Sequence, residues 1–306
     1  MTTTFRWVLW ASLAAFALAL AAALIADPAL LVRATWHGAD PLWTVWLPTA
    51  AGIALSWVIV TRRQRQELAN RVRTALEDHP IGAETCWLLL FLLCFVAGAV
   101  VLSRLLDAAF PPQAYVTAVP VVRVLFLFVL PILFIDRAGI TRVGASAPLP
   151  ALALRVNEPW RWLGLLPVAV CVGLVAVGVR DAHMPAPGAF ALATLVTVVA
   201  ISVPEEVFFR GMLQARLELL AGRWSGIAAT SLLFVLVHVL MDPYNEIVDL
   251  APTGSPHLLG AAVLTYGPLG VLLGYVWSQY GSIWLVILLR GAMLTLVVAP
   301  SVRIMD

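Results

Sequence analysis

The chain has 306 residues, of which 62% are hydrophobic and 12% are charged, and its formal net charge is +2. A soluble domain carries about 25% charged residues and about 45–50% apolar ones. This composition therefore excludes a soluble globular protein, a disordered chain and a nucleic-acid-binding protein. Because the net charge is small, it indicates no acidic partner, and the positions of the charges along the chain carry more information.

Apolar stretches long enough to cross a lipid bilayer recur along the whole chain. A transmembrane helix needs about 20 mainly apolar residues. Nine stretches approach or reach this length: residues 7–26, 42–60, 85–102, 115–135, 162–179, 188–210, 226–241, 258–279 and 283–299. We therefore predict an all-α fold, a polytopic integral membrane helix bundle with about eight or nine transmembrane helices. The first stretch is either a retained helix, which its length favours, or a cleaved signal peptide.

The arginines flank these stretches unequally. They concentrate in residues 61–79, 137–161 and 210–223, which fall on the same side of the membrane as Arg6. Since cytoplasmic segments carry an excess of positive residues, we predict a cytoplasmic N-terminus, in a protein of the bacterial inner membrane surrounded by the lipid bilayer. The segment 61–79 is interpreted as a solvated loop or surface helix.

A proline-bearing stretch separates the fourth apolar stretch from the fifth. Within residues 137–161 the chain has Pro148, Pro150 and Pro159. We therefore predict two units, with N-terminal transmembrane helices in residues 1–136 and a second helical unit in residues 137–306.

Ionisable side chains inside a bilayer are costly and indicate a functional site by default. Nearly all of those in this chain lie in the last four apolar stretches: Glu205, Glu206, Arg210, His238 and Arg290. Counting about 1.5 Å per residue along antiparallel neighbours places them at similar depth. The exception is Arg123 in the fourth stretch, which is interpreted as snorkelling or facing the bundle.

The spacing of these residues indicates separate roles. Glu206 and Arg210 are four residues apart, share one helical face and are expected to form an ion pair. Glu205 points about 100° away, so it is the freer carboxylate and the candidate general base, with His238 as proton carrier or water positioner. A carboxylate that activates water beside an imidazole is a minimal hydrolytic site. Structural ion pairs between helices would explain the same residues without any activity.

At these residues the sequence resembles the CPBP family, intramembrane endopeptidases of the CAAX-prenyl-protease and bacteriocin-processing type. The family's EExxxR motif reads 205–210 here, its FxxxH motif reads 234–238, and residues 281–289 look like the lead-in to its last motif, HxxxN. In the last motif Arg290 replaces the histidine and Leu294 replaces the asparagine. The resemblance reaches from about residue 140 to the C-terminus and implies a protease core there.

The resemblance implies an endopeptidase that hydrolyses a peptide bond in a membrane-associated protein or peptide precursor. Glu205 would activate water with help from His238, and Arg290 becomes the candidate oxyanion donor. A divalent metal, which some accounts of the family invoke, is disfavoured, because a guanidinium cannot ligate a cation and repels one. We therefore predict no cofactor and no metal site.

Three functions stay open. In the first, Arg290 stabilises the oxyanion and keeps a metal-independent protease active. In the second, Arg290 pairs with Glu205 and removes the general base, which leaves an inactive pseudoprotease that acts as a membrane scaffold or binding protein; two glutamates and two arginines then neutralise each other. The third is a transporter or channel that uses these charges, and the lack of matching broken helices in two halves argues against it.

Overall fold

The computed structural model of the chain describes residues 6–26, 28, 40–109, 118–136, 153–241 and 255–301. All regular elements in these ranges are helical. The first part holds α1 (Arg6–Ala26), η2 (Leu42–Trp46), α3 (Leu47–Ile59), α4 (Arg62–Ala75), α5 (Ile81–Ala109), α6 (Ala118–Val124), η4 (Leu125–Val129) and α7 (Leu130–Phe134). The second part holds α8 (Pro159–Trp162), α9 (Leu165–Gly178), α10 (Pro187–Leu195), η5 (Val196–Ser202), α11 (Val203–Glu206), η6 (Val207–Gln214), α12 (Ala215–Ala221), α13 (Arg223–Met241), α14 (Ser255–Tyr280), α15 (Ile283–Val298) and the 3₁₀ turn η8 (Ala299–Ser301).

The predicted all-α membrane bundle is confirmed. Each predicted apolar stretch lies on a helix or on a run of consecutive helices, although residues 115–117 of the fourth lie outside the described ranges. Among the described residues, six helices are long and apolar enough to cross a membrane, and shorter apolar helices cover Ala118–Phe134 and Ile283–Val298. The stretch predicted to end at residue 210 continues as one helical run, Pro187–Ala221.

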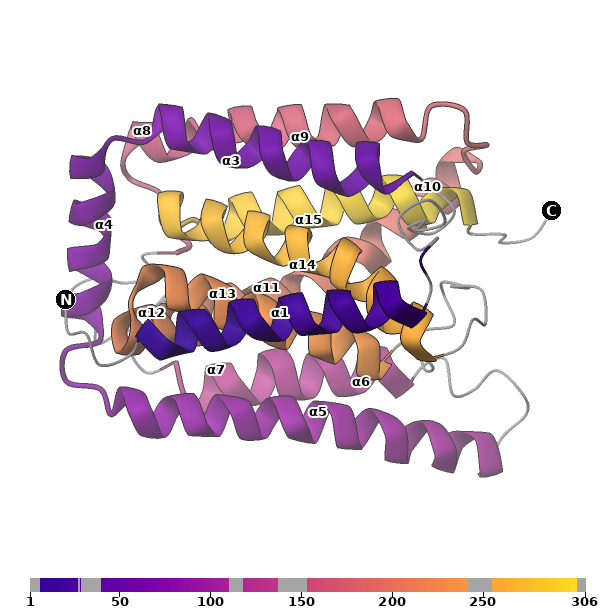
Figure 1. Cartoon of the computed structure of the whole chain (residues 1–306), viewed down its shortest axis with the longest axis horizontal. Helices are drawn as coiled ribbons and strands as arrows, with labels where there is room; N and C mark the ends of the chain where they lie inside the picture. The colour runs from indigo at the N-terminus through magenta and orange to yellow at the C-terminus, as the bar shows by residue number, and fades with distance from the viewer. Residues whose placement is uncertain are drawn as a thin grey trace.

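The long helices run roughly parallel to one another, and α4 lies across one end of the bundle (Figure 1). A capping box begins α4: the Thr61 hydroxyl accepts from the Gln64 amide, and the Gln64 side chain accepts from the Thr61 amide. Arg71 of α4 pairs with Glu158, just before α8. The arginine-rich segment 61–79 therefore contains a helix that is fixed across the ends of the spanning helices.

Residues from both halves of the sequence share one packed interior. α1 packs against α13 and α14, where Phe16 and Leu20 contact a small cluster that includes Val235 and Val263. The predicted division between residues 136 and 137 stays a prediction, and residues 137–152 lie outside the described part of the chain. Helices on either side of that division nevertheless meet at the candidate site described below.

A proline within α14 fixes the position of α14 beside η2. Pro268 lies inside the helix and has no amide proton, so the carbonyl of Leu264, one turn earlier, loses its usual donor. The indole Nε1 of Trp46 donates to this carbonyl at 2.9 Å. The backbone group that proline leaves unpaired is thus satisfied by a side chain from another helix.

Candidate active site

Two adjacent carboxylates lie where the longest helical run changes its winding. Glu205 and Glu206 belong to α11, a four-residue α-helical turn between the π-helical segments η5 and η6. Such π-helical insertions are rare and occur frequently at functional sites. Both glutamates are buried, with exposed fractions of 2% and 0%, so each needs a compensating positive partner.

Glu206 has two such partners. Its Oε2 lies 3.3 Å from the Nε of Arg210, four residues later, which confirms the ion pair expected from the spacing. Its Oε1 accepts a hydrogen bond of 2.9 Å from Nη1 of Arg290 in α15. Arg210 also donates to the carbonyl of Gly270 at 3.3 Å. Glu206 therefore links the two arginines and joins α11 to α15.

Glu205, like Glu206, has two guanidinium partners. Its Oε2 lies 2.6 Å from Nη2 of Arg290, and its Oε1 lies 2.9 Å from Nε of Arg123 in α6. The expectation that Glu205 is the freer carboxylate is therefore wrong. A count of residues along each helix gives depth only, and it gave no sign that the fourth apolar stretch would lie against α11.

Arg123 is the site residue that the sequence reasoning left aside. Of the two interpretations given for it, facing the bundle is correct, because its side chain is only 6% exposed and contacts Glu205. Its guanidinium carbon also lies 6.0 Å from the centre of the Phe95 ring. The available signal was a lone arginine in the middle of an apolar stretch, which by itself indicates a functional position.

The orientation of His238 follows from its backbone contact. Nδ1 lies 2.8 Å from the carbonyl oxygen of Phe234, which can only accept, so Nδ1 donates. In the neutral ring, Nε2 then carries the lone pair, and it lies 3.3 Å from Nη2 of Arg290 and 3.7 Å from Oε2 of Glu205. The ring of Tyr266 lies beside the imidazole, with centres 4.1 Å apart.

Arg290 is the centre of this group. It contacts both glutamates and His238, and its guanidinium carbon lies 4.7 Å from the centre of the Phe234 ring. Leu294, one turn further along α15, is partly buried and packs against the main hydrophobic core. The predicted site residues of all three motif regions thus meet, and the position of the family asparagine contributes apolar packing instead of a polar group.

The charges of the cluster do not cancel. Three guanidinium groups, from Arg123, Arg210 and Arg290, face two carboxylates. With His238 neutral, the described cluster carries one formal positive charge in excess. The count of two glutamates against two arginines omitted Arg123, so complete neutralisation is not what the structure contains.

The residues present do not fit a divalent metal. Among the described residues, no group of three or more histidine, cysteine, aspartate and glutamate side chains is arranged to hold a metal ion. Both carboxylates are occupied by guanidinium groups, which donate hydrogen bonds but cannot ligate a cation. A catalytic zinc usually has three protein ligands, which the described residues of this cluster do not offer.

The comparisons with known proteins agree with the resemblance. The fold and the buried cluster define a membrane helix bundle with a centre of carboxylate, imidazole and guanidinium groups. Residues 187–296 match the family model described as type II CAAX prenyl endopeptidase Rce1-like, so this part of the chain is similar to a family of membrane proteases. No curated protein and no solved structure matches the chain. The matched range contains all the predicted site residues but not Arg123.

Proposed function

We propose that this protein is an intramembrane endopeptidase that cleaves a membrane-associated protein or peptide precursor through a water molecule activated by Glu205. The observation that supports this most is the convergence of Glu205, His238 and Arg290, from three different helices, within 2.6 to 3.7 Å of one another. The match of residues 187–296 to a membrane protease family supports the same reaction class.

Glu205 is the proposed general base. A carboxylate offers about four lone-pair positions, and the ion pairs with Arg123 and Arg290 place one guanidinium group against each oxygen. A remaining lone pair takes a proton from water, and the hydroxide attacks the carbonyl carbon of the peptide bond. When the bond between carbon and nitrogen breaks, the proton passes from Glu205 to the leaving amine, which leaves a carboxylic acid and an amine as products.

Arg290 is the proposed oxyanion donor. Its guanidinium carries five N–H donors, and the contacts to Glu205, Glu206 and His238 leave others to meet the carbonyl oxygen of the substrate. Negative charge that develops on this oxygen competes with Glu205 for Arg290, and so frees Glu205 to hold the proton. His238, with its lone pair on Nε2, positions the water or relays the proton, while the pair of Glu206 and Arg210 holds Arg290 in place.

The substrate follows from the position of the cluster. Because Glu205 and Arg290 are buried and the cluster lies on apolar helices of a membrane bundle, the bond cleaved belongs to a peptide segment within or next to the bilayer. We expect a peptide or protein precursor in the bacterial inner membrane, with the N-terminus of the enzyme in the cytoplasm.

A second candidate, an inactive pseudoprotease that binds membrane proteins, is favoured by one specific observation. Arg290 contacts Glu205 Oε2 at 2.6 Å and also faces the lone pair of His238. A water molecule bridging the base and the imidazole would have to displace this guanidinium. If no substrate does so, the glutamate stays neutralised and the fold acts through binding alone.

The test compares membranes from cells that express the chain with membranes that carry Glu205→Gln. New protein termini are quantified by mass spectrometry. For a protease we expect cleavage products that fall by at least about 100-fold in the variant, stay unchanged with a chelator and stay unchanged in Glu77→Gln, which removes an exposed carboxylate on the connection before α5. Equal products from Glu205→Gln and the parent would overturn the protease proposal.

The double change Arg290→His with Leu294→Asn separates the two candidates. If the protein is a pseudoprotease, restoring the histidine and asparagine of the family motif produces termini that the parent does not produce. If the parent is already a protease with Arg290 as oxyanion donor, its products are present without the change and the double variant gains nothing. Full cleavage by the unchanged protein therefore excludes the pseudoprotease.

A further inference from the structure

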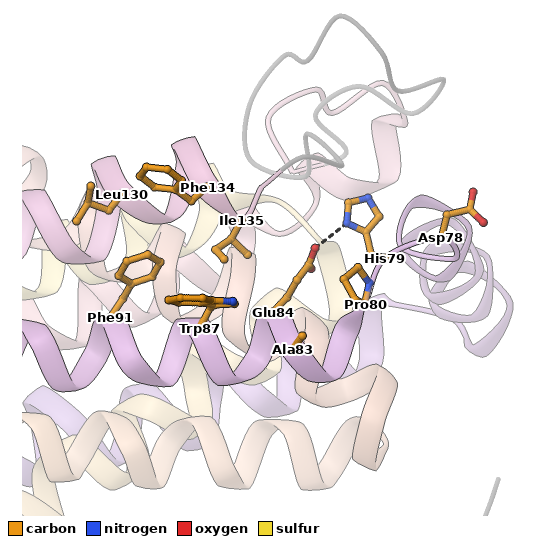
Figure 2. A pocket seen from close by; sticks show the side chains of 10 residues that line it. All are labelled: Asp78, His79, Pro80, Ala83, Glu84, Trp87, Phe91, Leu130, Phe134 and Ile135. Atoms are coloured by element: carbon orange, nitrogen blue, oxygen red, sulfur yellow. Dashed lines mark hydrogen bonds and ion pairs between the residues drawn. The ribbon is translucent and has the colours of Figure 1, made fainter.

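A recess lies between α5 and α7, and none of the residues that line it belongs to the glutamate cluster. It has a volume of about 770 Å³, within the range of about 300–1,000 Å³ that is usual for small-molecule sites. It is lined by the end of the connection between α4 and α5, by the first turns of α5 and by α7: Asp78, His79, Pro80, Ala83, Glu84, Trp87, Phe91, Leu130, Phe134 and Ile135. Figure 2 shows these side chains.

The recess is apolar along most of its length. Trp87 and Phe91 are one turn apart on α5, and they point toward α7, which contributes Leu130 and Phe134 (Figure 2). The exposed fractions of Trp87 and Phe134 are 53% and 58%, so the aromatic surfaces are open to whatever surrounds the bundle. From Glu84 to Phe91 the helix rises about 10 Å, which is enough to lie beside a large part of one acyl chain.

The other end of the recess is polar and acidic. The carboxylate of Glu84 is 9% exposed and lies 2.9 Å from Nδ1 of His79 and 2.7 Å from Nε of Arg216. A carboxylate only accepts, so Nδ1 of His79 donates to it, and Nε2 of the neutral ring remains an acceptor. Asp78 is exposed and adds a second carboxylate. Among the described residues at this end, Arg216 offsets Glu84 and Asp78 contributes one formal negative charge.

The polar and apolar ends of the recess are arranged like the headgroup and acyl chain of a lipid in a bilayer. Its polar end lies where α5 begins, next to the connection from α4, and α4 itself lies across the end of the bundle (Figure 1). Its apolar part extends from there along α5, in the direction of the spanning helices. A lipid molecule would therefore place its headgroup at Asp78 and its chain between Trp87 and Phe134.

We propose that this recess binds one membrane phospholipid whose headgroup carries a primary ammonium group, as in phosphatidylethanolamine. The ammonium would donate to Asp78 and to Nε2 of His79, and one acyl chain would pack between α5 and α7. A trimethylated ammonium has no N–H to donate to these acceptors, and an anionic glycerol headgroup would meet the carboxylate of Asp78. This binding site is independent of the proposed proteolysis.

The first experiment uses the unchanged full chain, purified in detergent and incubated with equal amounts of phosphatidylethanolamine, phosphatidylcholine and phosphatidylglycerol with identical acyl chains. Lipids retained in the complex are counted by native mass spectrometry. We expect retention of the ethanolamine lipid over the choline lipid by about tenfold, which corresponds to about 1.4 kcal/mol. Equal retention of these two lipids, or preferred retention of the glycerol lipid, would contradict the proposal.

Two matched pairs of variants locate the lipid. Asp78→Asn should reduce the preference for ethanolamine to nearly one, whereas Glu77→Gln removes an equal charge from the neighbouring exposed residue, which does not line the recess, and should preserve it. Leu130→Trp should fill the apolar part and release the lipid, whereas Leu93→Trp places the same bulk on an exposed position of α5 outside the recess. Unchanged retention in Leu130→Trp would place the bound lipid elsewhere and overturn the assignment.

Discussion

The Nε atom of Arg123 in α6 lies 2.9 Å from Oε1 of Glu205 in α11, and both side chains are almost fully buried. Arg123 lies outside residues 187–296, the range that matches the protease family. The carboxylate proposed as the base therefore depends on a residue that the matched range does not supply. Arg123 also gives the cluster its excess positive charge, and an uncompensated charge is costly in a low-dielectric interior.

This contact predicts unequal costs for the two partners. Glu205→Gln leaves the guanidinium of Arg123 without its carboxylate and removes one of two carboxylates from Arg290, so we expect a loss of about 3–5 kcal/mol in the free energy of unfolding. Arg123→Met leaves Glu205 paired with Arg290 and removes the excess charge, so we expect a smaller loss, about 1–3 kcal/mol. Unfolding of the purified variants in mixed detergent micelles measures both.

The double variant tests whether the two residues act together. Arg123→Met with Glu205→Gln should cost less than the sum of the single changes by about 1–3 kcal/mol, because contacting residues are coupled. Glu67 on α4 is an exposed carboxylate, so Arg123→Met with Glu67→Gln serves as the control and should be additive. Additivity in the pair Arg123 and Glu205 would show that the contact contributes no coupling.

The sequence was sufficient to predict that the charged residues of α11, α13 and α15 meet. Apolar length placed these helices, and residue counting placed Glu205, His238 and Arg290 at a common depth. Both arguments depend on distance along a helix axis, and this distance follows directly from the number of residues in the sequence. For this reason the helical membrane fold and the meeting of the motif residues could be predicted from the sequence.

The sequence did not predict which helices lie side by side. Nothing in the sequence says which apolar stretch lies beside α11, so the contact of Arg123 with Glu205 was missed. The pair of Arg290 with Glu205 was one of the alternatives drawn from the sequence, whereas the contacts of Arg290 with Glu206 and His238 depend on how α15 is rotated and were not predicted. The π-helical winding on both sides of α11 depends on tertiary packing and has no simple sequence signal.

A buried ion pair outside the candidate site should contribute strongly to stability. Nε of Arg216 lies 2.7 Å from Oε2 of Glu84, and Arg216 is fully buried. Arg216→Met removes the guanidinium partner of the buried Glu84 carboxylate and leaves its hydrogen bond with His79, so we expect a loss of about 3–5 kcal/mol. The control is Arg180→Met, which breaks the exposed pair with Asp181 and should leave the unfolding transition unchanged. Equal effects of the two changes would contradict this role.

The hydrogen bond from the Trp46 indole to α14 should make a measurable contribution to the free energy of unfolding. Trp46→Phe keeps most of the ring but removes the N–H that bonds the carbonyl of Leu264, and that carbonyl has no helical donor because of Pro268. We expect a loss of about 1–3 kcal/mol. Trp57→Phe makes the same change at a side chain that is 68% exposed and serves as the control. If both variants unfold alike, the indole bond does not stabilise α14.

The close contact between α12 and α13 rests on a glycine. A Cβ atom at Gly226 would lie 2.8 Å from the backbone nitrogen of Glu218 and 3.0 Å from its Cα, and backbone atoms cannot move aside cheaply. Gly226→Ala should therefore push the two helices apart and cost about 1–3 kcal/mol. Gly173→Ala on α9, where a Cβ would meet no other atom within 4 Å, should be neutral or slightly stabilising. Because α13 carries His238, Gly226→Ala should also weaken any cleavage by the protein, and a variant that unfolds and cleaves like the parent would show that this helix contact is not needed.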